Sequence, residues 1–164
     1  GLEAKERADM LVKYVDALLE LYPSCKAVVF GPSHKFLSRE SIENHSDKAV
    51  TRFIYYAVNV RYFSIQGTED MIVDSLGMST LFLPDVQYHF HGMNPDEVVN
   101  HAYSVLYYIF EHDNPIGDGE TIAGLENGDM SPDIQWKVQY EDSLIQPVRE
   151  VLDINMGEYA SGTR

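Results

Sequence analysis

The most constraining feature of the sequence is a long amphipathic helix whose start is specified around Asn94. The Asn94 side chain can accept hydrogen bonds from the first helical amides, Pro95 suits the first helical position, and Glu97 completes a capping arrangement. Apolar residues then recur at three- and four-residue spacing until about His112: Val98, Ala102, Val105, Leu106, Ile109 and Phe110. Such a stripe must cover another apolar layer, which we expect to be a β-sheet.

Several segments have the composition of strands that can form this sheet. Residues 27–30, 52–65, 71–75, 134–140 and 148–154 are rich in β-branched, aromatic or other apolar residues, and 121–123 is a shorter candidate. Residues 86–91 alternate between apolar and polar side chains, which is typical of a strand with one buried face. The link between 52–65 and 71–75 is so short that these two strands are expected to run antiparallel.

Two further helices are predicted in the first part of the chain. Apolar residues at helical spacing run from about Lys5 to Tyr22, where Pro23 ends the helix, and Ser38 can cap a short helix over 38–45. We therefore predict an α+β fold in which a mostly antiparallel β-sheet packs against two main helices. Residues 1–155 are expected to form a single domain, and 156–164 a flexible tail.

The charge balance limits the partners that the protein can have. The chain has 12 Lys and Arg against 26 Asp and Glu, a formal net charge of -14. A field of this sign opposes phosphate backbones and anionic lipids, so neither a nucleic acid nor a membrane is an expected partner. The expected partners are a basic protein or a second copy in a homodimer. The single Cys25 cannot form an intrachain disulfide, and there is no targeting segment, so the cytoplasm is the expected compartment.

A pair of histidines is the clearest candidate for a metal site. His89 and His91 project from the same face of the predicted strand, where both imidazoles can bind one divalent metal. A third ligand can come from Glu97 or His101, four residues apart on the predicted helix, or from Asp85. Histidines on the solvent face of a strand are also common without a metal, so both interpretations stay open. No other cofactor is predicted.

An acidic loop over residues 113–120 is a second candidate for cation binding. The EF-hand pattern does not fit it, because Ile116 and Leu125 fall where oxygen ligands are required. Asp118 and Glu120 therefore either form a looser site or accept hydrogen bonds from backbone amides in tight turns. The sequence contains no complete phosphate loop, dinucleotide fingerprint or nucleophile motif.

Several motifs in this order resemble a bacterial family of unknown function, DUF4261. They are VNVRYF (58–63), GMSTL (77–81), LPDVQYHF (83–90), NPDEVVN (94–100), YYIFE (107–111) and DGETI (118–122). The resemblance implies that the chain is the C-terminal part of a longer protein with an additional N-terminal portion. It implies no catalytic residues. An unpaired sheet edge left by the missing portion would favour a homodimer.

The sequence favours a non-enzymatic binding or protein-interaction module. The absence of a complete catalytic constellation, the acidic charge and the many Tyr and Met residues are the reasons. Trp136 either lines a ligand pocket or closes the core. One alternative is a metal-dependent hydrolase-like enzyme that uses His89 and His91. Another is an immunity-type inhibitor whose acidic surface blocks a basic toxin.

Overall fold

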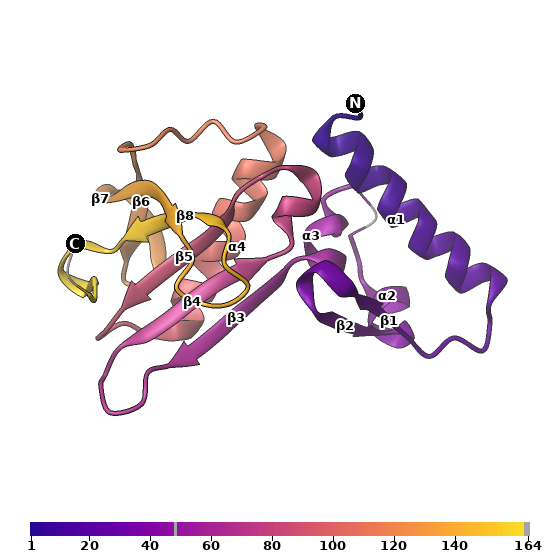
Figure 1. Cartoon of the computed structure of the whole chain (residues 1–164), viewed down its shortest axis with the longest axis horizontal. Coiled ribbons are helices and arrows are strands. Elements are labelled where there is room, and N and C mark those ends of the chain that lie inside the picture. Colours follow the sequence, from indigo (N-terminus) through magenta and orange to yellow (C-terminus); the bar gives the residue numbers. More distant parts are fainter. Residues whose placement is uncertain (48, 163–164) are drawn as a thin grey trace. The chain divides into compact units, whose positions relative to one another are not determined.

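The structure, a computed structural model, describes residues 1–47 and 49–162 (Figure 1). They form two compact units. The first unit comprises Gly1–Asn59 and Leu76–Leu83, and the second comprises Val60–Ser75 and the described residues from Pro84 onward. The predictions of one domain over 1–155 and a flexible tail stay predictions.

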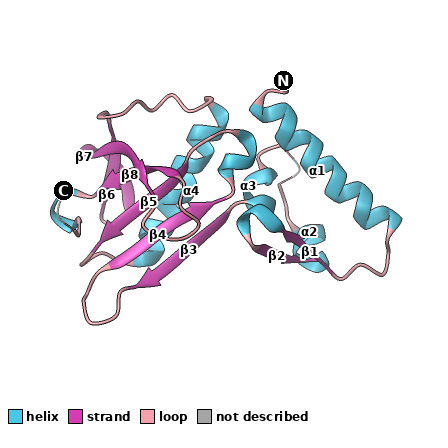
Figure 2. Cartoon of the chain, in the orientation of Figure 1, coloured by secondary structure: helices cyan, strands magenta, loops and turns pink. Residues whose placement is uncertain are grey.

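The first unit is mainly helical (Figure 2). Its elements are α1 (Ala4–Leu21), β1 (Ala27–Phe30), β2 (Lys35–Ser38), α2 (Arg39–Asn44), α3 (Arg52–Ala57) and a 3-10 helix (Met78–Leu81), with β1 and β2 forming an antiparallel pair. The buried stripe of α1 packs against α3 and the 3-10 helix. The Ser38 side chain accepts a hydrogen bond from the Ser41 amide, as predicted for the start of α2.

The strand predicted over 52–65 is wrong in its first half. Residues Arg52–Ala57 form the helix α3, and only Asn59–Ser64 form a strand, β3. Phe53, Ile54 and Tyr56 are buried in this short helix. Packing within this unit therefore overrides the strand propensity of the aromatic residues.

The second unit contains a six-stranded sheet with the order β3-β4-β5-β8-β7-β6. Its other strands are β4 (Met71–Leu76), β5 (Asp85–Phe90), β6 (Thr121–Glu126), β7 (Asp129–Asp142) and β8 (Glu150–Asn155). The pairs β4–β5, β7–β8 and β6–β7 are antiparallel, whereas β5–β8 is parallel. The predicted α+β class with two main helices is confirmed, and the parallel pair makes the sheet mixed.

The helix α4 (Pro95–Glu111) covers one face of this sheet (Figure 1). Its start is as predicted, because the Asn94 side chain accepts a hydrogen bond from the Asp96 amide at 3.0 Å. The apolar stripe of α4 is buried together with the apolar side chains of β5, Val86, Tyr88 and Phe90. The opposite face of the sheet is polar, since Asp74, Gln87 and Asp153 lie in register across β4, β5 and β8. The alternation in β5 thus separates an apolar face from a polar one.

Candidate functional site

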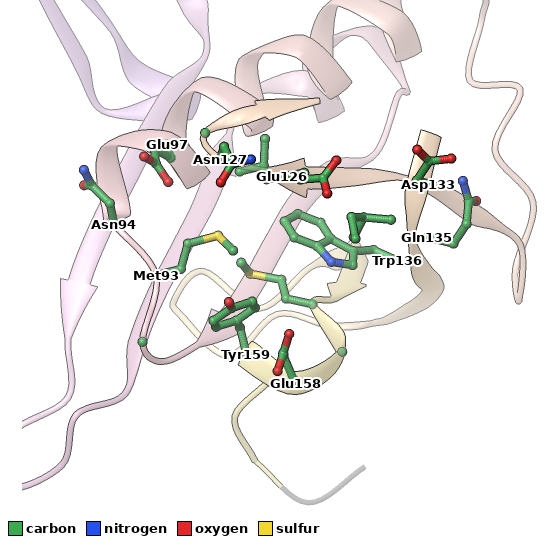
Figure 3. A pocket seen from close by; sticks show the side chains of 16 residues that line it. Met93, Asn94, Glu97, Glu126, Asn127, Asp133, Gln135, Trp136, Glu158 and Tyr159 are labelled. Atoms are coloured by element: carbon green, nitrogen blue, oxygen red, sulfur yellow. The ribbon is translucent and has the colours of Figure 1, made fainter. Parts of the chain in front are cut away.

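A cavity of about 650 Å³ lies in the second unit, beside the start of α4. Its walls come from the loop before α4, the first turn of α4, the β6–β7 hairpin and residues 156–159. Figure 3 shows side chains from these segments around a common space, among them Met93, Asn94, Glu97, Trp136 and Tyr159. Segments far apart in the sequence therefore contribute to one site.

The turn between β6 and β7 brings this hairpin close to α4. Asn127 and Gly128 have φ values of 53° and 85°, which matches the positive φ that a two-residue hairpin turn requires. A Cβ atom on Gly128 would lie only 3.0 Å from the Glu97 Oε1 atom. Glycine therefore permits the close approach of the turn to the carboxylate of Glu97.

The indole of Trp136 forms an apolar wall of the cavity and is 2% exposed. The pairing of β6 with β7 shifts register between Ala123 and Gly124. A Cβ atom on Gly124 would lie 2.6 Å from the Trp136 ring, so this glycine makes room for the indole. The His101 ring packs against Trp136, with the ring centroids 4.8 Å apart. The indole is thus held in place by β6 and by α4.

Four carboxylates surround the cavity and give it a negative charge. They belong to Glu97, Glu126, Asp133 and Glu158, and Figure 3 shows them on different sides of Trp136. Within the described part of the chain, none of the four forms an ion pair, and the lining includes no Lys, Arg or His. Uncompensated carboxylates beside aromatic and thioether groups favour a ligand that combines positive charge with apolar surface.

The predicted ligand His101 is a buried residue that uses both ring nitrogens in hydrogen bonds. Its Nε2 atom lies 2.8 Å from the Ala123 carbonyl oxygen, and its Nδ1 atom lies 2.9 Å from the Tyr88 hydroxyl. Because a carbonyl only accepts, Nε2 carries the proton and the Tyr88 hydroxyl donates to Nδ1. Burial lowers the pKa of His101 and raises the pKa of Tyr88 well above its usual value. The pair is neutral and connects β5, α4 and β6.

The predicted ligands His89 and His91 lie near Asp70 and Ser161. The Ser161 hydroxyl donates to Asp70 at 2.8 Å and lies 3.0 Å from the His91 Nδ1 atom. The His89 Nε2 atom is 3.7 Å from an Asp70 carboxylate oxygen. In addition, the His91 amide donates to the Tyr159 carbonyl and the Ser161 amide donates to the His89 carbonyl. These contacts hold the segment that carries Tyr159 against β5.

The structure thus distributes the predicted metal ligands over different environments. Glu97 borders the cavity, His101 is buried behind it, and Asp85 forms an ion pair with Arg149. In residues 1–47 and 49–162, no group of three or more His, Cys, Asp or Glu side chains could hold a metal ion. A metal site built on His89 and His91 stays a prediction.

The acidic loop uses its carboxylates in backbone hydrogen bonds. The Tyr140 amide donates to Asp118 at 2.9 Å, and the Gly117 amide donates to Glu120 at 2.8 Å. This is the second of the two interpretations that the sequence left open. The carboxylates stabilise the loop between α4 and β6.

A charged network on the polar face of the sheet was missed in the sequence. Arg149 donates to Asp74 at 2.9 Å and to Asp85 at 3.3 Å, while Arg61 binds Asp74 with two hydrogen bonds of 2.8 and 2.5 Å. Both arginines also donate to carbonyl groups of the loop between β7 and β8, at Ile145, Gln146 and Pro147. The available signal was an aspartate within an apolar strand, because a buried carboxylate requires a cationic partner.

The comparisons with known proteins identify a family but no activity. A family model described as a domain of unknown function (DUF4261) matches residues 74–155. No curated protein and no solved structure matches the chain significantly. The matched region includes α4 and the β6–β7 hairpin of the cavity but ends before Glu158 and Tyr159. Among the helices that the structure describes, none has the length and apolar character needed to cross a membrane.

Proposed function

This chain belongs to the DUF4261 family, whose function is unknown, and we propose that it is a non-enzymatic binding module. Its ligand is a positively charged segment of a protein partner, which binds in the cavity beside Trp136. The observation that carries this proposal is the set of four carboxylates that border the cavity without an ion-pair partner among the described residues.

The chemistry of the cavity favours a lysine or arginine side chain over a neutral or acidic one. Glu97 and Glu158 can accept hydrogen bonds from an ammonium or guanidinium group, and charge-assisted hydrogen bonds are stronger than neutral ones. The ring of Tyr159, which also lines the cavity, can attract the same cations. The methylene groups of a long basic side chain can meanwhile pack on the apolar wall. Both parts of such a side chain are therefore accommodated.

The charge of the whole molecule supports the same class of partner. A net charge of -14 raises the rate at which a basic protein meets the cavity, and the effect decreases with salt. It opposes a homodimer, because two copies repel each other. The immunity-type inhibitor is one form of this proposal, in which the basic partner is a toxin.

Fluorescence anisotropy with labelled Lys- and Arg-containing peptides tests this function. We expect binding that weakens at high salt and decreases by about tenfold in the double variant Glu97→Gln, Glu126→Gln, which removes two negative charges from the cavity. The control is the single variant Glu150→Gln, because Glu150 is exposed on β8 and lies outside the cavity lining. Equal affinity in the double variant and the wild type would refute the proposal.

A further inference from the structure

A second, smaller hollow of about 430 Å³ lies between α4 and β6. Its lining is mainly apolar and includes Val105, Tyr108, Ile122 and Met130. Tyr108 and Met130 are each 47% exposed, which is high for side chains of this size and hydrophobicity. The hollow therefore offers apolar surface that a ligand can cover.

The hollow and the cavity lie along the same seam of the molecule. On α4, Glu97, His101, Val105 and Tyr108 follow each other at spacings of four, four and three residues, so they share one side of the helix. Glu97 lines the cavity, and Val105 and Tyr108 line the hollow. Between the cavity and the hollow, the hydrogen bond from His101 Nε2 to the Ala123 carbonyl joins α4 to β6.

The distance between the two sites follows from the geometry of these elements. Glu97 and Val105 are about 12 Å apart along α4 at 1.5 Å per residue. Along β6, Leu125 of the cavity and Ile122 of the hollow are about 10 Å apart. An extended peptide advances by about 3.3 Å per residue, and a polyproline II segment by about 3.1 Å. Side chains four positions apart in an extended strand, or three positions apart in a polyproline II segment, point to the same side and can therefore reach both sites.

We infer that the cavity and the hollow form one groove for an extended peptide. This inference rests on the proposed function. A Lys or Arg of the partner segment binds in the cavity beside Trp136. A bulky apolar side chain, three or four positions away, binds in the hollow against Tyr108 and Met130. The occupant is a basic protein segment with an apolar side chain, because four carboxylates line the cavity whereas the lining of the hollow is mainly apolar.

The position of β6 favours an extended peptide over a helix. β6 is the last strand of the sheet order and contributes to both the cavity and the hollow. An edge strand presents backbone groups to an added extended chain. His101 occupies the Ala123 carbonyl, so the added chain must use the other groups of β6.

Anisotropy titrations with a set of labelled peptides of equal composition test this groove. Each peptide carries one Lys and one Leu at spacings of one, three, four or seven positions, and one further peptide carries Lys with Leu replaced by Ser. We expect spacings of three or four to bind about tenfold more tightly than the Leu-free peptide, since a buried apolar side chain adds this much or more.

Variants of the hollow show where the apolar side chain binds. The double variant Tyr108→Ser, Met130→Ser should abolish the advantage of the Leu-containing peptides and leave the affinity for the Leu-free peptide unchanged. Both residues are substantially exposed, so the variant should fold. The matched control is Leu144→Ser, because Leu144 is 50% exposed in the same unit but outside both sites.

The possible outcomes distinguish this groove from the proposed function. If binding depends on Glu97 and Glu126 but Leu adds nothing at any spacing, the groove is refuted and the proposed function stands. A preference for a spacing of seven refutes the extended conformation, because seven positions match two turns of a helix. If no cationic peptide binds, both inferences fail. If light scattering shows that the wild type is a dimer and that the double variant Tyr108→Ser, Met130→Ser is a monomer, a second copy is the occupant. The assignment of the groove to a peptide is then wrong.

Discussion

Replacing Arg149 by Ala should destabilise the second unit more than most single substitutions. The Arg149 side chain is 11% exposed and forms ion pairs with Asp74, which is fully buried, and with Asp85, which is 1% exposed. It also donates to the Ser75 carbonyl. Removing the guanidinium group leaves two buried carboxylates with fewer partners.

The size of the loss follows from the contacts that remain. Removing one partner of a buried ion pair lowers the free energy of unfolding by about 3 to 5 kcal/mol. Asp74 keeps its two hydrogen bonds from Arg61, and Asp85 keeps the hydroxyl of Ser75 at 2.8 Å. We therefore expect a decrease of about 3 kcal/mol in the free energy of unfolding. At about 2 to 4 °C per kcal/mol, the unfolding midpoint falls by about 6 to 12 °C.

Trp136 makes the measurement specific for this unit. It is the single tryptophan of the chain and is buried in the second unit, so its emission reports the unfolding of that unit. Thermal and urea unfolding of wild type and Arg149→Ala should be followed by this emission. Arg149→Lys keeps the positive charge but loses the planar fork, and its stability should lie between the two.

Two results would contradict this reasoning. A loss below about 1 kcal/mol in Arg149→Ala would mean that the network has the weak energetics of a surface ion pair. Lys137→Ala is the matched control, since Lys137 is exposed on β7 and should change stability by no more than about 0.5 kcal/mol. An equal loss in this control would show that the loss of positive charge, and not the network, destabilises the protein.

Three further predictions concern the cavity and the histidines. Burial lowers the pKa of His101 in the folded state. The stability that the neutral His101 ring contributes should therefore be present above the unfolded-state pKa of 6.5 and should be lost as pH falls through the lower folded-state pKa. The free energy of unfolding, measured across this pH range, should depend less on pH in His101→Asn than in the wild type. Gly124→Ala should displace the Trp136 indole, shift its emission to the red and destabilise the unit by about 1 to 3 kcal/mol, and unchanged emission would contradict the packing at this glycine. The metal interpretation predicts a stoichiometric divalent metal by elemental analysis in wild type and its loss in His89→Ala, His91→Ala, whereas metal in neither sample would exclude it.

The sequence was sufficient for elements whose ends and faces are specified by nearby residues. The Asn94 cap and the apolar stripe after it predict α4, and the alternation around Tyr88 predicts the two faces of β5. These features depend on hydrogen bonds and side-chain periodicities that span only a few residues. The helix α3 was missed because its aromatic residues have strand propensity and became helical only through burial within their unit.

The turn at Asn127 and Gly128 shows that part of the candidate site had a local signal. An Asn-Gly pair between two apolar segments is a strong hairpin signal, and it places Glu126 at the end of β6. The sequence also presented Trp136 as a residue that either lines a pocket or closes the core. The structure places its indole in the wall of the cavity while keeping it 2% exposed.

The chain's local patterns account for its fold class, its negative charge and its principal helix. They do not account for the cavity, because Glu97, Asp133 and Glu158 are distant in sequence and meet only when β7, α4 and the segment after β8 pack around Trp136. The charged network of Arg149 has the same origin, since Arg149 directly precedes β8 while its partners Asp74 and Asp85 lie on β4 and β5. Periodicity and capping act over a few residues, whereas the convergence of these charges depends on strand order, which local patterns do not encode.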